Sequence, residues 1–220
     1  MSIDLSTKKR EFIDVLYKQV GDEKLYLDLY FPTQIVDNMS VFVYVHGGGF
    51  LWYDKSIVDE TFRINHTSYK NRLLEHNFLF VSVEYRRDKV DEYSCVEAQI
   101  EDVKDAIKWI KKHADALHCN PNNIGLWGLS AGGALALGAA YNSDSLYTHT
   151  IYPHISSSVS YVIDFYGITD IYSYYNLRSF TDKSDEDKET TLDLIYRHTN
   201  IRVTNEQYYK NVKDIADTHS

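Results

Sequence analysis

The chain is poor in cysteine and proline and has no long apolar run. Its 220 residues include two cysteines, Cys95 and Cys119, and three prolines. Two cysteines cannot build the disulfide framework of a small secreted domain, so we expect both to be free and buried. No apolar stretch approaches the ~20 residues of a membrane-spanning helix, and residues 1–10 lack the apolar segment of a signal peptide. These absences predict a cytoplasmic protein that does not contact membranes.

Positive charge is also scarce. The 23 Lys and Arg residues face 32 Asp and Glu residues, which gives a net charge of −9. A surface of this sign repels phosphates, so we expect no nucleic-acid partner. The nearest grouping of Cys and His is His113 to Cys119, whose spacing does not indicate a metal site, and we expect neither metal nor cofactor. A hydrophobic content of 44% is enough for one core, which predicts a single domain over 1–220.

The most informative segment is Gly128-Leu-Ser130-Ala-Gly132. An apolar run leads into this Gly-x-Ser-x-Gly pattern, and a segment of small residues, 131–140, follows it directly. This order predicts a strand, a tight turn and a helix, with the serine at the apex of the turn and its hydroxyl exposed. The alternative is a glycine-rich turn without chemistry, because the pattern also occurs by chance.

A second motif upstream argues against that alternative. The β-branched and aromatic run 41–45 ends in His46-Gly47-Gly48-Gly49. Three glycines in a row cost backbone entropy, and an oxyanion hole, in which bare N–H groups approach a substrate oxygen, explains them. A phosphate-binding loop fits less well, because neither motif has the Lys-Ser/Thr ending of a P-loop or the pattern Gly-x-Gly-x-x-Gly.

The two motifs, in this order, resemble those of α/β-hydrolases, and within them the hormone-sensitive-lipase-like esterases and their acetyl-esterase relatives. The resemblance runs from about Phe12 to Asp170 and includes 24–32, 81–86 and 102–109. It implies a serine esterase that acts on a small-molecule ester.

The resemblance also implies the roles of individual residues. Ser130 is the implied nucleophile, and His46 is implied to shape the glycine loop rather than to transfer protons. The implied oxyanion hole consists of the backbone N–H groups of Gly48, Gly49 and Ala131. Trp52 and Tyr53 directly follow the glycine loop, and we expect them to line the substrate pocket.

The expected fold is an α/β-hydrolase three-layer sandwich with a mostly parallel sheet. We expect strands at about 11–18, 24–31, 40–46, 78–84, 123–127 and 159–166, and helices near 58–76, 95–117 and 130–142. The helix 95–117 is the clearest, because apolar residues recur at three- and four-residue steps from Val96 to Ile110. Residues 168–216 are expected to form a helical insertion, and the last two strands of the fold are expected to be missing.

Those two strands carry the acid and the histidine of the catalytic triad in the family that the chain resembles. We therefore expect the triad to be incomplete in this chain. The histidines after the nucleophile, which we expect to be solvated rather than catalytic, are His149, His154, His198 and His219.

Two functions remain open at this point. The first is a serine carboxylesterase that hydrolyses short acyl or acetyl esters through an acyl-enzyme on Ser130. The second is an inactive or nearly inactive hydrolase-fold fragment or binding scaffold. In either case the strand 159–166 is expected to become a sheet edge, through which two copies of the chain could dimerise.

Overall fold

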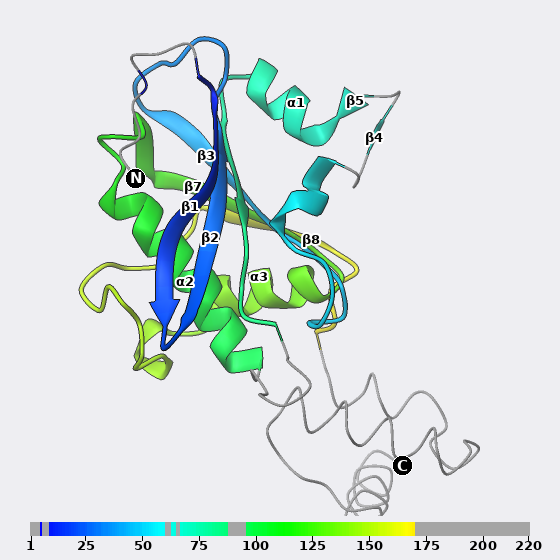
Figure 1. Cartoon of the computed structure of the whole chain (residues 1–220), viewed down its shortest axis with the longest axis vertical. Coiled ribbons are helices and arrows are strands. Elements are labelled where there is room, and N and C mark those ends of the chain that lie inside the picture. Colours follow the sequence, from blue (N-terminus) through cyan, green and yellow to red (C-terminus); the bar gives the residue numbers. More distant parts are fainter. Residues whose placement is uncertain (1–4, 6–8, 60–62, 65–66, 88–95, 170–220) are drawn as a thin grey trace, which may run out of the picture.

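The computed structural model describes residues 5, 9–59, 63–64, 67–87 and 96–169, and Figure 1 shows how they are arranged. Six strands form the central sheet, in the order β1-β2-β6-β3-β7-β8. β1 is antiparallel to β2 and β2 to β6, whereas β6, β3, β7 and β8 run parallel. The strands are β1 (Glu11–Val20), β2 (Glu23–Tyr30), β3 (Met39–Val45), β6 (Leu79–Val83), β7 (Cys119–Leu129) and β8 (Tyr161–Phe165). All six correspond to strands that the sequence predicts, although their ends differ by a few residues.

The central strands are apolar on both faces, which is typical of a parallel sheet covered by helices on both sides. On β3, Val41, Val43 and Val45 belong to the core cluster that contains α2 (Val96–Lys112) and α3 (Ala131–Tyr141). Phe42 and Tyr44, which point the other way, belong to a second cluster that packs against α1 (Tyr69–Glu75). In Figure 1, α2 and α3 accordingly lie together and α1 lies apart from them. The predicted three-layer α/β architecture is confirmed.

The expected helix over 58–76 is wrong in its first half. A short 3-10 helix (Lys55–Asp59) and two two-residue strands, β4 (Arg63–Ile64) and β5 (Thr67–Ser68), precede a helix that begins only at Tyr69. The side chain of Ser68 accepts a hydrogen bond from the backbone N–H of Asn71 at 3.2 Å. Ser68 is therefore an N-cap, and this capping fixes where the helix starts.

The charged face of α2 is buried rather than solvated. The ammonium group of Lys18 on β1 lies 2.7 Å from a carboxylate oxygen of Asp102 and 2.7 Å from one of Asp105. Arg86, just after β6, donates to both carboxylate oxygens of Asp102, at 2.8 and 2.9 Å. Burial alone disfavours the charged ammonium, but the two aspartates outweigh it and raise the pKa of Lys18. Ion pairs thus connect β1, the end of β6 and α2 inside the protein.

The remaining expectations can be checked only in part. Cys119 is free and buried, as expected, and burial raises the pKa of its thiol to about 12. Cys95 and all but the first two residues of the expected insertion 168–216 lie outside the described residues. In the described part of the chain, no helix combines the length and the apolar character needed to cross a bilayer.

Candidate active site

Ser130 lies at the apex of the turn between β7 and α3. Its backbone has φ 53° and ψ −120°, a conformation that a residue with a side chain adopts only when its surroundings impose it. The N–H of Ser130 donates to the carbonyl of Phe165 at the end of β8, at 2.9 Å. Strained backbone of this kind occurs at functional sites, and here it lies at the carboxyl end of β7, directly before α3.

The positions two residues away from Ser130 on either side require glycine, because a Cβ atom there would overlap neighbouring backbone atoms. A Cβ atom at Gly128 would overlap the carbonyl oxygen of Gly132, and a Cβ at Gly132 would overlap the carbonyl oxygens of Val45 and His46. A Cβ at Gly47 would lie 2.7 Å from the carbonyl oxygen of Leu129 and 3.4 Å from the Cβ of Ser130. The start of the glycine loop therefore packs directly against the serine turn, as the pairing of the two motifs predicts.

Two N–H groups of the glycine loop, those of Gly48 and Gly49, make no hydrogen bond to the described residues. Gly48 and Gly49 have φ values of 120° and 61°, and the carbonyl of Gly48 accepts from the N–H groups of Leu51 and Trp52, at 3.1 and 2.9 Å. Within the described part of the chain, the N–H groups of Gly48 and Gly49 have no acceptor. Ala131 is the first residue of α3, so its N–H has no partner within the helix. Free N–H groups of this kind are what an oxyanion hole needs.

His46 is buried within this loop. Its ring stacks on that of Tyr85, with the ring centres 4.3 Å apart, and its Nδ1 donates to the carbonyl of Gly47 at 2.7 Å. Burial lowers the pKa of His46 to about 4, so the ring is neutral at pH 7. A neutral, buried ring that bonds its own loop shapes that loop, in line with the role that the sequence implies.

Trp52 and Tyr53 lie on the solvent side of the loop. Their exposed fractions are 64% and 60%. The ring of Trp52 lies next to Gly49, where an added Cβ would be 3.3 Å from it. The carbonyl of Tyr53 accepts a hydrogen bond from Arg87 at 2.8 Å. Their expected contact with substrate stays a prediction.

The described residues do not supply a base for Ser130. Its hydroxyl makes no hydrogen bond to any of them. His149 and His154 are exposed on the connection after α3, and the backbone N–H of His149 donates to Glu101 on α2. His198 and His219 lie outside the described residues. No group of three or more potential metal ligands occurs among the residues described.

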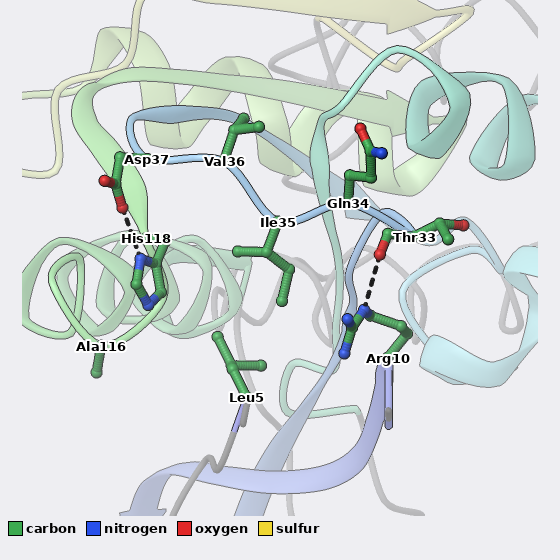
Figure 2. A pocket seen from close by; sticks show the side chains of 9 residues that line it. All are labelled: Leu5, Arg10, Thr33, Gln34, Ile35, Val36, Asp37, Ala116 and His118. Atoms are coloured by element: carbon green, nitrogen blue, oxygen red, sulfur yellow. Dashed lines mark hydrogen bonds and ion pairs between the residues drawn. The ribbon is translucent and has the colours of Figure 1, made fainter. Parts of the chain in front are cut away.

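The broad pocket in Figure 2 is a different site. It has a volume of about 1020 Å³ and contains the pair His118 and Asp37, whose side chains are 2.7 Å apart. His118 immediately precedes β7, whereas Ser130 immediately follows it, so the length of the strand, ~30 Å, separates the two. His118 and Asp37 therefore form a hydrogen-bonded pair at the surface and cannot act on Ser130.

Sequence reasoning missed two residues whose side chains form hydrogen bonds to backbone carbonyls of the glycine loop. The hydroxyl of Tyr85 donates to the carbonyl of His46 at 2.9 Å, and the side-chain amide of Gln99 donates to the carbonyl of Phe50 at 3.1 Å. The available signal was weak: Gln99 is a polar residue next to the apolar stripe of α2.

Comparison with known proteins places this geometry among esterases. Residues 27–215 match the sequence model of the BD-FAE family. The butyrate-bound structure of the esterase Est2 from Thermogutta terrifontis is 25% identical, covers 84% of this chain and 62% of its own, and has a TM-score of 0.65. A bifunctional GH43-CE protein from Bacteroides eggerthii is 26% identical, covers 84% of this chain and 26% of its own, and has a TM-score of 0.63. Esterase E4 of Myzus persicae is 27% identical over 149 residues, which are 62% of this chain and 23% of that protein.

These relatives share the α/β-hydrolase fold with this chain. The chain spans about three fifths of the solved Thermogutta esterase and at most a quarter of the curated relatives.

Proposed function

The chain belongs to the BD-FAE family, with which it matches over residues 27–215, and on this premise we propose that it is a serine carboxylic ester hydrolase for short acyl esters. The observation that carries the proposal is the strained backbone of Ser130, with φ 53° and ψ −120°, beside Gly48 and Gly49, whose N–H groups have no acceptor among the described residues. The butyrate bound to the Thermogutta esterase supports the short acyl group. The cytoplasmic location and the absence of a nucleic-acid partner stay predictions.

In the proposed reaction, the Oγ of Ser130 attacks the ester carbonyl carbon and loses its proton to a base. The carbonyl oxygen becomes an oxyanion, which accepts hydrogen bonds from the N–H groups of Gly48, Gly49 and Ala131. Collapse of this intermediate expels the alcohol, which takes up a proton, and leaves the acyl group on Ser130. Water then attacks the acyl-enzyme, releases the carboxylic acid and restores the hydroxyl.

The base is proposed to lie outside the described residues or in another chain. His46 is excluded, because its ring is buried and its free Nε2 makes no hydrogen bond to Ser130 or to any other described residue. The proposed sources are an undescribed residue such as His198 or His219, residues downstream of these 220, or a partner chain. Without a base, the oxyanion hole alone gives a residual rate.

The proposal predicts that activity depends on Ser130. Hydrolysis of p-nitrophenyl acetate and butyrate is measured for the wild type, Ser130→Ala and Ser156→Ala, in which an exposed serine of the connection before β8 is lost. Because Ser130→Ala removes the group that forms the acyl-enzyme, it is expected to lower kcat by about 10⁴-fold, and Ser156→Ala is expected to leave kcat unchanged. Equal rates for Ser130→Ala and wild type would contradict the proposal.

We also propose that two copies of the chain pair through β8. In the described part of the chain β8 pairs only with β7, and Tyr161 and Ile163 on it are 36% and 39% exposed. Antiparallel pairing centred on Ile163 sets Tyr161 opposite Phe165 of the second copy and Asp164 opposite Val162, so no like charges meet.

Light scattering at micromolar concentration tests the dimer. The wild type is expected to have twice the mass of the chain, and Ile163→Lys, which adds a charge at the centre of the pairing, is expected to have the mass of a monomer. A monodisperse wild-type monomer would overturn this arrangement.

A further inference from the structure

Two backbone carbonyls that flank the glycines of the loop accept hydrogen bonds from distant side chains. Tyr85 donates to the carbonyl of His46, and Gln99 donates to that of Phe50. These two bonds come from residues 39 and 49 positions away along the chain. They hold the two ends of the segment that contains Gly48 and Gly49.

The end at Phe50 is the strained one. Phe50 has φ 68°, in the left-handed region that favours glycine, and it follows Gly48 and Gly49, which also have positive φ. Its side chain is 1% exposed and packs in the core with α2 and α3. A left-handed residue with a large side chain costs about 1 kcal/mol, so the loop needs an interaction that stabilises it there.

Gln99 is unusual for the position that it occupies. It is fully buried on α2, and the oxygen of its side-chain amide has no hydrogen-bond partner among the described residues. Burial of an amide with an unpaired oxygen is unfavourable, and an apolar side chain of the same size would avoid this cost. The one side-chain bond that Gln99 makes to the described residues, to the carbonyl of Phe50, is therefore what distinguishes it from a leucine.

We propose that Gln99 is a positioning residue for the oxyanion hole: it fixes the carbonyl of Phe50 and so keeps the N–H groups of Gly48 and Gly49 directed at the substrate carbonyl above Ser130. The catalytic part of this inference rests on the proposed esterase function. Gln99 itself touches neither the substrate nor Ser130 and acts through the loop.

The test compares Gln99→Leu with Ile100→Val. Leucine keeps the volume of Gln99, removes the donor and also removes the unpaired oxygen. Ile100→Val shortens the adjacent core residue of α2 but leaves the bond to Phe50 in place, so it controls for loosening of the helix. Each variant is examined in two ways, by kcat and KM for p-nitrophenyl acetate and by amide hydrogen exchange at Leu51 and Trp52, whose N–H groups bond to Gly48.

Gln99→Leu is expected to lower kcat by about 10- to 100-fold with KM unchanged, because an interaction with the transition state alone is weakened. Exchange at Leu51 and Trp52 is expected to become at least about tenfold faster, since the turn opens more often. Ile100→Val is expected to lower the Tm and to leave both readouts unchanged.

The two readouts separate this inference from the proposed function. Unchanged exchange in Gln99→Leu overturns the inference, whatever the activity. Faster exchange with unchanged kcat overturns the catalytic role. If the wild type shows no Ser130-dependent hydrolysis, the proposed function fails, and exchange alone still decides whether Gln99 holds the loop.

Discussion

Replacement of Gly132 by alanine is expected to destabilise the protein by about 3 kcal/mol and to lower esterase activity by at least about 100-fold. Helix propensity alone predicts the opposite, a gain of about 1 kcal/mol, because Gly132 lies in α3. The added methyl would overlap the carbonyl oxygens of Val45 and His46, which are backbone atoms and cannot move without shifting the glycine loop. The steric effect is therefore expected to win.

Gly138→Ala is the matched control for this substitution. Gly138 lies in the same helix, so the propensity gain is the same, but its added methyl would meet side-chain atoms of Ile100, at 2.5 Å and beyond, rather than backbone atoms. Urea unfolding and ester hydrolysis are measured for both variants. A Gly132→Ala variant that is as stable and active as Gly138→Ala would contradict the close packing of the two motifs.

Replacement of Asp102 by asparagine is expected to cost about 3–5 kcal/mol of unfolding free energy. Asp102 is fully buried and accepts hydrogen bonds from the backbone N–H and the guanidinium of Arg86, and it also pairs with Lys18 at 2.7 Å. In the variant Lys18 keeps Asp105 at 2.7 Å and Arg86 keeps Glu101 at 3.5 Å, but the NH₂ group of the amide faces the donors that the carboxylate had accepted from. The loss is therefore mainly that of buried donors left without an acceptor.

Asp37→Asn supplies the comparison in urea unfolding. Asp37 also pairs with a basic side chain, that of His118, at 2.7 Å, but its own side chain is 86% exposed. Because water screens such pairs, this change is expected to cost less than about 1 kcal/mol. Similar losses in both variants would mean that the ion pairs around Asp102 are not buried as described.

The sequence predicts well what is encoded locally. The apolar, β-branched runs of β3 and β6, the small residues of α3 and the two glycine motifs each determine their own backbone, and all appear where expected. α1 shows the limit of such patterns. Residues 58–76 contain apolar residues that resemble one helix, yet the cap at Ser68 and the short strands before it restrict the helix to Tyr69–Glu75.

Interactions between distant parts of the chain could not be predicted. The sequence shows only the apolar stripe of α2, and it is the approach of Lys18 and Arg86 that explains why Asp102 is buried. The proposed role of Gln99 likewise depends on the contact between α2 and the glycine loop, which the sequence does not show. The expected roles of Gly48, Gly49, Ala131, Trp52 and Tyr53 in binding substrate remain predictions.

The central claim is that Ser130 is an activated nucleophile, and covalent labelling tests it most directly. The purified chain, Ser130→Ala and Ser156→Ala are exposed briefly to a fluorophosphonate, and the intact masses are measured. We predict fast, stoichiometric labelling of the wild type and of Ser156→Ala, and none of Ser130→Ala, which would also mean that a base assists the serine. A folded wild-type chain that stays unlabelled would contradict the claim, and would identify this chain as a hydrolase scaffold whose serine is unassisted.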